Sequence, residues 1–187
     1  TAYNQTAESL QVALIFRSVY FDIVNDLDLP ELKETFNLVE GSDGNQVVMT
    51  LPADIVKVHW IKYNIDDDDE DTANYREVCF LEVADFMDRA NALRGMTDTD
   101  SISLTSGSGG TYEVIYRTDK FPEYYTMVDD LLVFDSIDES VDTIKLQTEK
   151  TFCYGSINPT FTLSDAFQPD LDAQQYRYWL HRVKVRA

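Results

Sequence analysis

The residues whose spacing comes nearest to a metal site lie in an acidic run at positions 66–71. Set against a twelve-residue calcium loop, acidic side chains fall at ligand positions 1, 3, 5 and 12, which are Asp66, Asp68, Glu70 and Glu77. The sixth position, where the sharp turn of the loop requires glycine, is Asp71. We therefore interpret the run as a solvated acidic loop, with calcium at these four carboxylates as the alternative.

No other set of residues has the spacing of a catalytic or cofactor site. The two histidines, His59 and His181, and the two cysteines, Cys79 and Cys153, are not at metal-ligand spacing. The glycine-rich segment 106–110 lacks the Gly-Lys-Ser/Thr ending of a phosphate-binding loop. Paired carboxylates carry no information in a chain that has 34 of them. We expect no catalytic residue, no cofactor and no resident metal, and hence a protein that is not an enzyme.

The balance of charge restricts the possible partners. The 187 residues include 34 acidic and 15 basic ones, for a net charge of −19, which excludes nucleic-acid binding by bulk attraction. Beyond Asp172 there is no acidic residue, whereas four strongly basic ones follow: Arg177, Arg182, Lys184 and Arg186. Cations at the C-terminal end of a helix are favoured by its dipole. The same four residues also suit docking on an acidic partner surface, and both interpretations stay open.

The elements that must position these residues begin and end with a helix. Thr6 is a good cap for the first one, and Pro30 closes the segment. Its apolar residues cover most of the helical circumference, so it needs cover on most sides, from the core or from a neighbouring subunit. We expect Phe16, Val19 and Ile23 to contact a neighbour. The last helix opens at Pro169 and Asp170, and its apolar stripe is Tyr176, Trp179, Leu180 and Val183.

Between the helices, alternating apolar residues predict antiparallel strands with one inserted helix. In the segment 55–63, Val56, Val58 and Trp60 fall on one face, so we expect Trp60 in the core. No segment is long and apolar enough for a membrane helix, and we expect no membrane partner. The expected fold is α+β, with the N- and C-terminal helices packed as a bundle and an antiparallel β domain inserted between them. The expected parts form one structural unit: residues 1–30 (N-terminal helix), 31–165 (β-rich, with a helix at 82–94) and 166–187 (C-terminal docking arm).

Several motifs along the chain resemble one protein family. They are Leu51-Pro52-Ala53-Asp54, then Phe121-Pro122-Glu123-Tyr124-Tyr125-Thr126 with the turn Asp129-Asp130 and Leu132-Val133-Phe134-Asp135, then Cys153-Tyr154-Gly155, Asn158-Pro159-Thr160 and Asp165-Ala166-Phe167-Gln168-Pro169-Asp170-Leu171. Together they resemble the head-to-tail adaptor (connector) proteins of short-tailed bacteriophages. The acidic run and the end at Ala187, inside a predicted helix, depart from that family, and we expect the natural chain to extend further.

The resemblance implies a structural virion protein. Such adaptors form a homo-oligomeric ring, a dodecamer, beneath the portal, extend the DNA channel for genome retention and ejection, and receive the next tail component, a nozzle or tail fibre protein. The implied location is the neck of the virion, with the host cytoplasm during assembly. The implied docking residues on the portal are the four basic ones near the C-terminus. An acidic body suits a channel through which DNA slides without sequence-specific binding.

Two functions from other classes remain as alternatives. An acidic DNA-mimic inhibitor would carry carboxylates in phosphate-like register on exposed faces, and it would compete with DNA for a nuclease. A glycan hydrolase associated with a tail would use two of the many carboxylates, and it would lose activity on single carboxylate substitutions.

Overall fold

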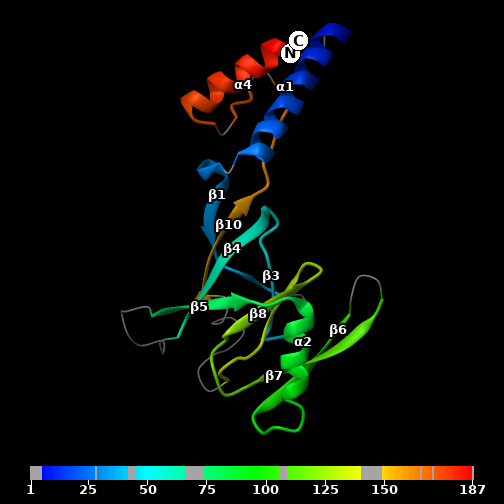
Figure 1. Cartoon of the computed structure of the whole chain (residues 1–187), viewed down its shortest axis with the longest axis vertical. Coiled ribbons are helices and arrows are strands. Elements are labelled where there is room, and N and C mark those ends of the chain that lie inside the picture. The colour runs from blue at the N-terminus through cyan, green and yellow to red at the C-terminus, as the bar shows by residue number, and fades with distance from the viewer. Residues whose placement is uncertain are drawn as a thin grey trace. The chain divides into compact units, whose positions relative to one another are not determined.

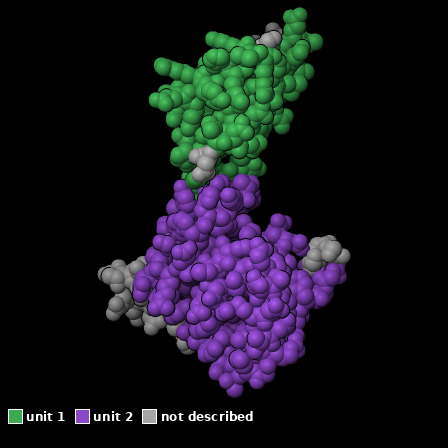
Figure 2. All heavy atoms as spheres, in the orientation of Figure 1, with its two compact units in different colours: residues 1–34, 157–187 green, residues 35–156 purple. Residues whose placement is uncertain are grey.

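A computed structural model of the chain describes residues 6–27, 29–41, 45–65, 74–105, 109–139, 149–164, 166–169 and 171–186. The acidic run at 66–71, the predicted strand at 143–146 and most of the glycine-rich segment lie outside these residues. The chain divides into two compact units (Figure 2). Residues 1–34 with 157–187 are called the terminal unit here, and residues 35–156 the sheet unit.

The helices of the terminal unit begin at side-chain caps. Helix α1 (Ala7–Asp26) starts with a capping box, in which the Thr6 hydroxyl accepts from the Ser9 amide and the Ser9 hydroxyl accepts from the Thr6 amide. A short 3-10 turn, η2 (Pro30–Leu32), follows. Helix α4 (Ala173–Arg186) begins at Asp172, whose carboxylate accepts from the amides of Gln174 and Gln175. The cap at Thr6 is the predicted one, whereas the second cap lies two residues beyond the predicted Asp170.

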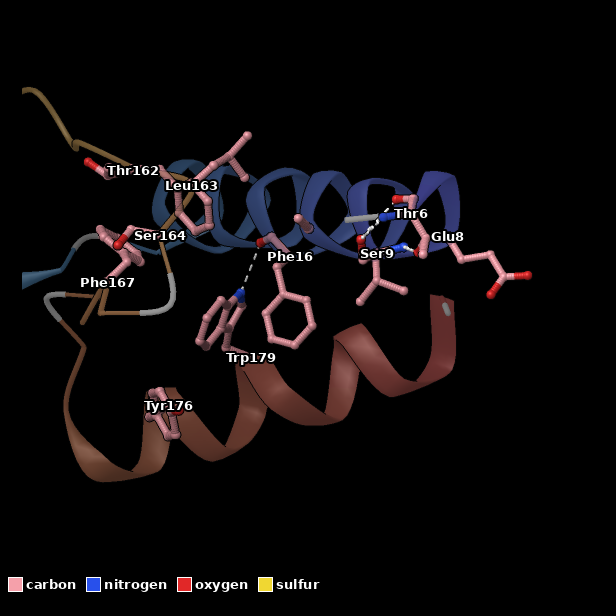
Figure 3. Close-up of a pocket in the computed structure, with 13 residues that line it drawn as sticks. Thr6, Glu8, Ser9, Phe16, Thr162, Leu163, Ser164, Phe167, Tyr176 and Trp179 are labelled. Carbon is pink, nitrogen blue, oxygen red and sulfur yellow. Dashed lines mark hydrogen bonds between the residues drawn. The ribbon is translucent and has the colours of Figure 1, made fainter. Parts of the chain in front are cut away.

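The core of the terminal unit joins residues from both ends of the chain. Val19, Tyr20 and Ile23 of α1 are buried against Trp179 and Val183 of α4, with which they form one apolar cluster. The Trp179 indole N–H donates to the Phe16 carbonyl at 3.2 Å, and the two rings meet edge to face at 5.1 Å (Figure 3). Phe161 and Leu171, from the segment between the sheet and α4, pack on the same cluster. The C-terminal part of the terminal unit therefore begins at residue 157, well before α4, because this segment belongs to the core of the helices.

The sheet unit contains a large mixed sheet of eight strands in the order β1-β10-β4-β5-β8-β9-β3-β2. Its strands are β1 (Lys33–Phe36), β2 (Val39–Glu40), β3 (Val48–Thr50), β4 (Ile55–Asn64), β5 (Tyr75–Phe80), β8 (Tyr124–Val128), β9 (Leu131–Phe134) and β10 (Thr151–Ile157). Two further strands, β6 (Thr99–Thr105) and β7 (Thr111–Arg117), form a separate antiparallel hairpin. Helix α2 (Val83–Ala92) buries Phe86 and Ala90 and contacts β7 and β8 (Figure 1).

The predicted fold class is wrong. The described chain is a mixed α/β structure dominated by the eight-stranded sheet, and it is not a helical bundle with an inserted antiparallel β domain. The two terminal helices do pack on each other, but the remaining long helix, α2, packs on strands. The sheet is also not purely antiparallel, because β5 and β8 pair in parallel. A parallel pair needs a long crossover, and here the chain between these strands forms α2 and the β6–β7 hairpin.

The expected facing of strand β4 is also wrong. Ile61 and Tyr63 are fully buried, whereas Trp60 is only half-buried and Val56 is 59 % exposed. The register with β5 pairs Ile61 with Val78, and both side chains belong to the core cluster. Burial does not alternate strictly along β4, because the partly buried Val58 also packs on that cluster. Simple two-residue periodicity from Val56 therefore assigns Trp60 to the wrong side.

We predict that Ile61→Ala destabilises the protein by about 2–5 kcal/mol, because it leaves a cavity in a fully enclosed site. Trp60→Ala is expected to cost less, since the indole already contacts solvent. Urea unfolding followed by circular dichroism compares the two variants. A larger loss for Trp60→Ala than for Ile61→Ala would contradict the observed facing of β4.

Candidate interaction surfaces

The candidate calcium ligands are mostly outside the described residues. Asp66, Asp68 and Glu70 belong to the undescribed segment, and Glu77 is an exposed residue of β5 whose register partner is Lys62 of β4. Within the part of the chain that the structure describes, no group of three or more histidine, cysteine or acidic side chains is placed to hold a metal ion. The described helices include none with the length and hydropathy needed to cross a membrane.

The two histidines belong to different units and have different surroundings. His59 lies on β4, where its Nε2 is 2.8 Å from the Ser156 hydroxyl and its ring lies near Tyr154. His181 is exposed on α4, in the terminal unit. Both are surface residues, and within the described residues neither is hydrogen-bonded or ion-paired to a cysteine or a carboxylate.

The cysteines are two free thiols in contrasting environments. Cys79 is exposed on β5, and Cys153 is completely buried on β10. Burial raises the pKa of the Cys153 thiol to about 12, so that this side chain stays protonated and unreactive at neutral pH. Its role is to fill the core beside Tyr125, whose pKa burial also raises to about 12.

The terminal unit carries an apolar groove of about 610 Å³. Aromatic side chains line it: Phe16 of α1, Tyr176 and Trp179 of α4, and Phe161 and Phe167 of the segment before α4. Figure 3 labels Phe16, Phe167, Tyr176 and Trp179. Its rim is polar and comes from the first turn of α1 and from Thr162 and Ser164. All lining residues belong to one unit, so the groove is a property of the packed terminal helices themselves.

The first half of α1 beside this groove is largely uncovered. Residues 6–18 include no buried side chain, and Leu10, Val12 and Leu14 are 39 %, 41 % and 48 % exposed. Of the predicted neighbour contacts, Val19 and Ile23 have no exposed surface, because both are enclosed by their own chain. Phe16 alone of the three stays accessible, as part of the groove. The sequence does indicate that Leu10, Val12 and Leu14 need a contact partner, because they belong to the apolar pattern that covers most of the helical circumference.

The basic residues of α4 divide into two sets that face different ways. Arg186 pairs with Asp22 at 2.6 Å, and Arg182 with Asp26 at 3.5 Å, so both cations hold α4 to α1. Arg177 and Lys184 are exposed, and no ion pair is found for either within the described residues. The four predicted docking residues therefore do not form one strip: two are used within the chain and two face outward.

The sheet unit presents a partly exposed aromatic surface of its own. Trp60 of β4 lies 5.3 Å from Phe152 and 5.6 Å from Tyr154 of β10, and it is nearly parallel to the latter ring. Tyr75 of β5 extends the group, and the Lys62 ammonium lies 5.1 Å from the Trp60 ring. These aromatic pairs stabilise the sheet across three strands, which is a structural use for Trp60 outside the core.

We predict that a thiol reagent such as dithionitrobenzoate at pH 8 modifies Cys79 rapidly in the folded protein and Cys153 only after unfolding in urea. The reason is that burial keeps the Cys153 thiol both inaccessible and protonated at that pH. Absorbance of the released thiolate counts the reactive groups, and Cys79→Ser is the control that abolishes the fast reaction. Rapid modification of both thiols in the native state would contradict the buried position of β10.

We predict that the aromatic contact between α1 and α4 contributes more to the free energy of unfolding than the ion pairs do. Trp179→Ala is expected to cost about 3–5 kcal/mol, because it empties a buried site shared by both helices. Arg186→Ala is expected to cost less than about 1 kcal/mol, because the pair with Asp22 is roughly half exposed and screened by solvent. Helical circular dichroism during urea unfolding measures both, and equal costs would contradict this ranking.

No protein-family model matches this sequence, and no curated protein is significantly similar to it.

Proposed function

We propose that the protein is a structural adaptor of a bacteriophage virion, which assembles as a ring between the portal and the next tail component and extends the DNA channel. The single observation that carries the proposal is the uncovered apolar half of α1 with the aromatic groove beside it. Val12 lines that groove, and an exposed apolar patch of this kind marks a contact site for another protein. In a ring, each copy binds one neighbour through this surface, and the other neighbour binds it through the same surface of its own.

The charge of the chain supports the same proposal. A net charge of −19 keeps a channel wall from binding the phosphates that pass along it. It also makes copies repel one another at long range, so that assembly must rely on local apolar contact and on the few outward cations. Leu10, Val12, Leu14 and Phe16 are the proposed contact residues, in place of the enclosed Val19 and Ile23.

The proposed contact with the portal uses the outward cations of α4. Arg177 and Lys184 are free to meet acidic side chains of another protein, whereas Arg182 and Arg186 act inside the terminal unit by holding α4 in place. Under this division, loss of Arg182 or Arg186 weakens docking only indirectly, through the position of α4.

We predict that the triple variant Leu10→Ser, Val12→Ser, Leu14→Ser folds normally but no longer forms a ring on the portal protein of the same genome. These side chains contribute little to the core, since all three are exposed, but they supply the apolar contact area. Co-expression with that portal, followed by electron microscopy of the purified particles, measures ring formation, and circular dichroism measures folding.

The matched control for this experiment is the double variant Val39→Ser, Val56→Ser. It removes two apolar side chains of similar exposure, 48 % and 59 %, from the sheet unit. The control is expected to assemble as the wild type does. A wild-type chain that forms no ring on the portal, or a genome that encodes no portal, would defeat the proposed function.

A further inference from the structure

The exposed half of α1 carries two apolar faces with different surroundings. Val12, Ala13 and Phe16 line the aromatic groove, and Figure 3 shows Phe16 on the side of α1 that faces α4. Leu10 and Leu14, which are 39 % and 48 % exposed, are not among the lining residues. They are four positions apart, so they lie beside each other on the helix surface, roughly a third of a turn away from the groove side. This pair is called the leucine ridge here.

The leucine ridge lies in an unusually long stretch of sequence without charge. Residues 9–16 are eight consecutive uncharged positions, whereas each of the other exposed large apolar side chains of the described chain lies in an uncharged stretch of at most five. Copies of a chain with a net charge of −19 repel one another, so contact between copies is most favourable where carboxylates are fewest. The ridge is therefore the apolar surface that a second copy can approach with the least repulsion.

The aromatic groove has the same low charge. Glu8, at its rim, is the single charged residue among the described residues that line it. Its volume of about 610 Å³ is in the range of pockets that hold drug-sized ligands, so it has room for two leucine side chains. The chain cannot fill the groove with its own ridge, because Leu10 and Leu14 lie on another side of the helix that forms one wall.

A second hollow with little charge lies in the sheet unit, and its lining is different. It measures about 530 Å³, and Asp130 is the single charged residue among the described residues that line it. Its walls include Pro52, Val56 and Met127, and the described residues that line it include no aromatic side chain. The groove is lined by five aromatic side chains, which offer large apolar areas. A leucine side chain therefore buries more apolar area in the groove than in this hollow.

We infer that the leucine ridge of one copy inserts into the aromatic groove of a second copy. Ridge and groove are different surfaces, so the contact is head-to-tail: each copy offers its ridge to one neighbour and receives the ridge of the other neighbour in its groove. Such a contact repeats from copy to copy until it closes a ring. The inference rests on the proposed function and identifies both halves of its apolar contact. Leu10 and Leu14 are inserted, whereas Val12 and Phe16 belong to the wall that receives them.

Disulfide exchange between single-cysteine variants of the full chain measures which surfaces meet. All variants carry Cys79→Ser, and the buried Cys153 stays unreactive in the folded chain. The donor, Leu14→Cys, is first converted to its mixed disulfide with thionitrobenzoate. The acceptor, Tyr176→Cys in the groove, is then added. Its thiolate attacks the protein sulfur of the mixed disulfide and releases thionitrobenzoate, whose absorbance gives the rate. Because each chain carries one reactive thiol, every product joins two copies.

Two acceptors and one donor serve as matched controls. Tyr178→Cys replaces a side chain of α4 that is 47 % exposed, against 40 % for Tyr176, and that does not line the groove. Val56→Cys places the thiol in the second hollow. The control donor, Val39→Cys, replaces a side chain of the sheet unit that is as exposed as Leu14, at 48 %. Each acceptor rate is divided by the rate of the same thiol with dithionitrobenzoate, which removes differences in intrinsic reactivity.

The inferred contact predicts that Leu14→Cys reacts with Tyr176→Cys about tenfold or more faster than with either control acceptor, because docking raises the effective concentration of the two thiols. The Val39→Cys donor is expected to show no such preference. Adding Leu10→Ser to the Leu14→Cys donor is expected to lower its rate with Tyr176→Cys by about threefold or more, since half of the ridge is lost. Circular dichroism of each variant measures folding.

The outcomes separate this inference from the proposed function. Equal rates with the three acceptors, which are expected if the groove takes a segment of a different protein, overturn the ridge–groove contact. Faster exchange with Val56→Cys overturns it too, as does a preference of Leu14→Cys for a second Leu14→Cys chain, the result of a symmetric pairing of two α1 helices. Each of these results leaves ring formation on the portal to be judged by the electron microscopy described above. A clear preference for the groove in a chain that forms no ring on the portal supports the contact and defeats the portal adaptor.

Discussion

The packing of Trp179 against α1 is the interaction on which the terminal unit depends. The indole reaches a carbonyl 163 positions earlier in the chain and fills the site between the two helices. Neither helix can bury its apolar face alone, since the cluster takes three residues from α1 and two from α4. Because the two ends of the chain meet here, residues 35–156 form an insertion between the two parts of this unit.

That packing also decides which apolar residues remain for other proteins. Helix α4 covers the second half of α1 around Val19 and Ile23 and leaves the first half, with Leu10, Val12 and Leu14, exposed. The aromatic groove lies at the boundary between the covered and uncovered parts. An apolar helix that is enclosed along half of its length can thus serve as core and as contact surface at once.

Charge is distributed by the same arrangement. In an acidic chain, a cation near a carboxylate is readily neutralised, and α4 places Arg182 and Arg186 beside two acids of α1. Among the described residues, no acid pairs with Arg177 or Lys184 on the other side of α4, so these cations keep their attraction for acids elsewhere. In the sheet unit, Asp85 and Asp88 of α2 are exposed, whereas Phe86 and Ala90 of the same helix are buried.

Local sequence determined the elements themselves. The caps of α1, the apolar periodicity of both terminal helices and the turn signals of the β8–β9 hairpin are short-range features, and the structure contains each of these elements.

The tertiary structure alone decided which elements pair. The parallel contact of β5 with β8, the inward facing of Ile61 instead of Trp60, and the enclosure of Val19 and Ile23 all depend on partners distant in the chain. Periodicity reports that a residue has an apolar side to cover, but it carries no information on whether a strand, a helix or another chain provides the cover. The basic residues near the C-terminus illustrate the same limit. Their spacing in the sequence predicts that they share one helix. Which of them form ion pairs depends on the position of α1, which supplies the acids for Arg182 and Arg186.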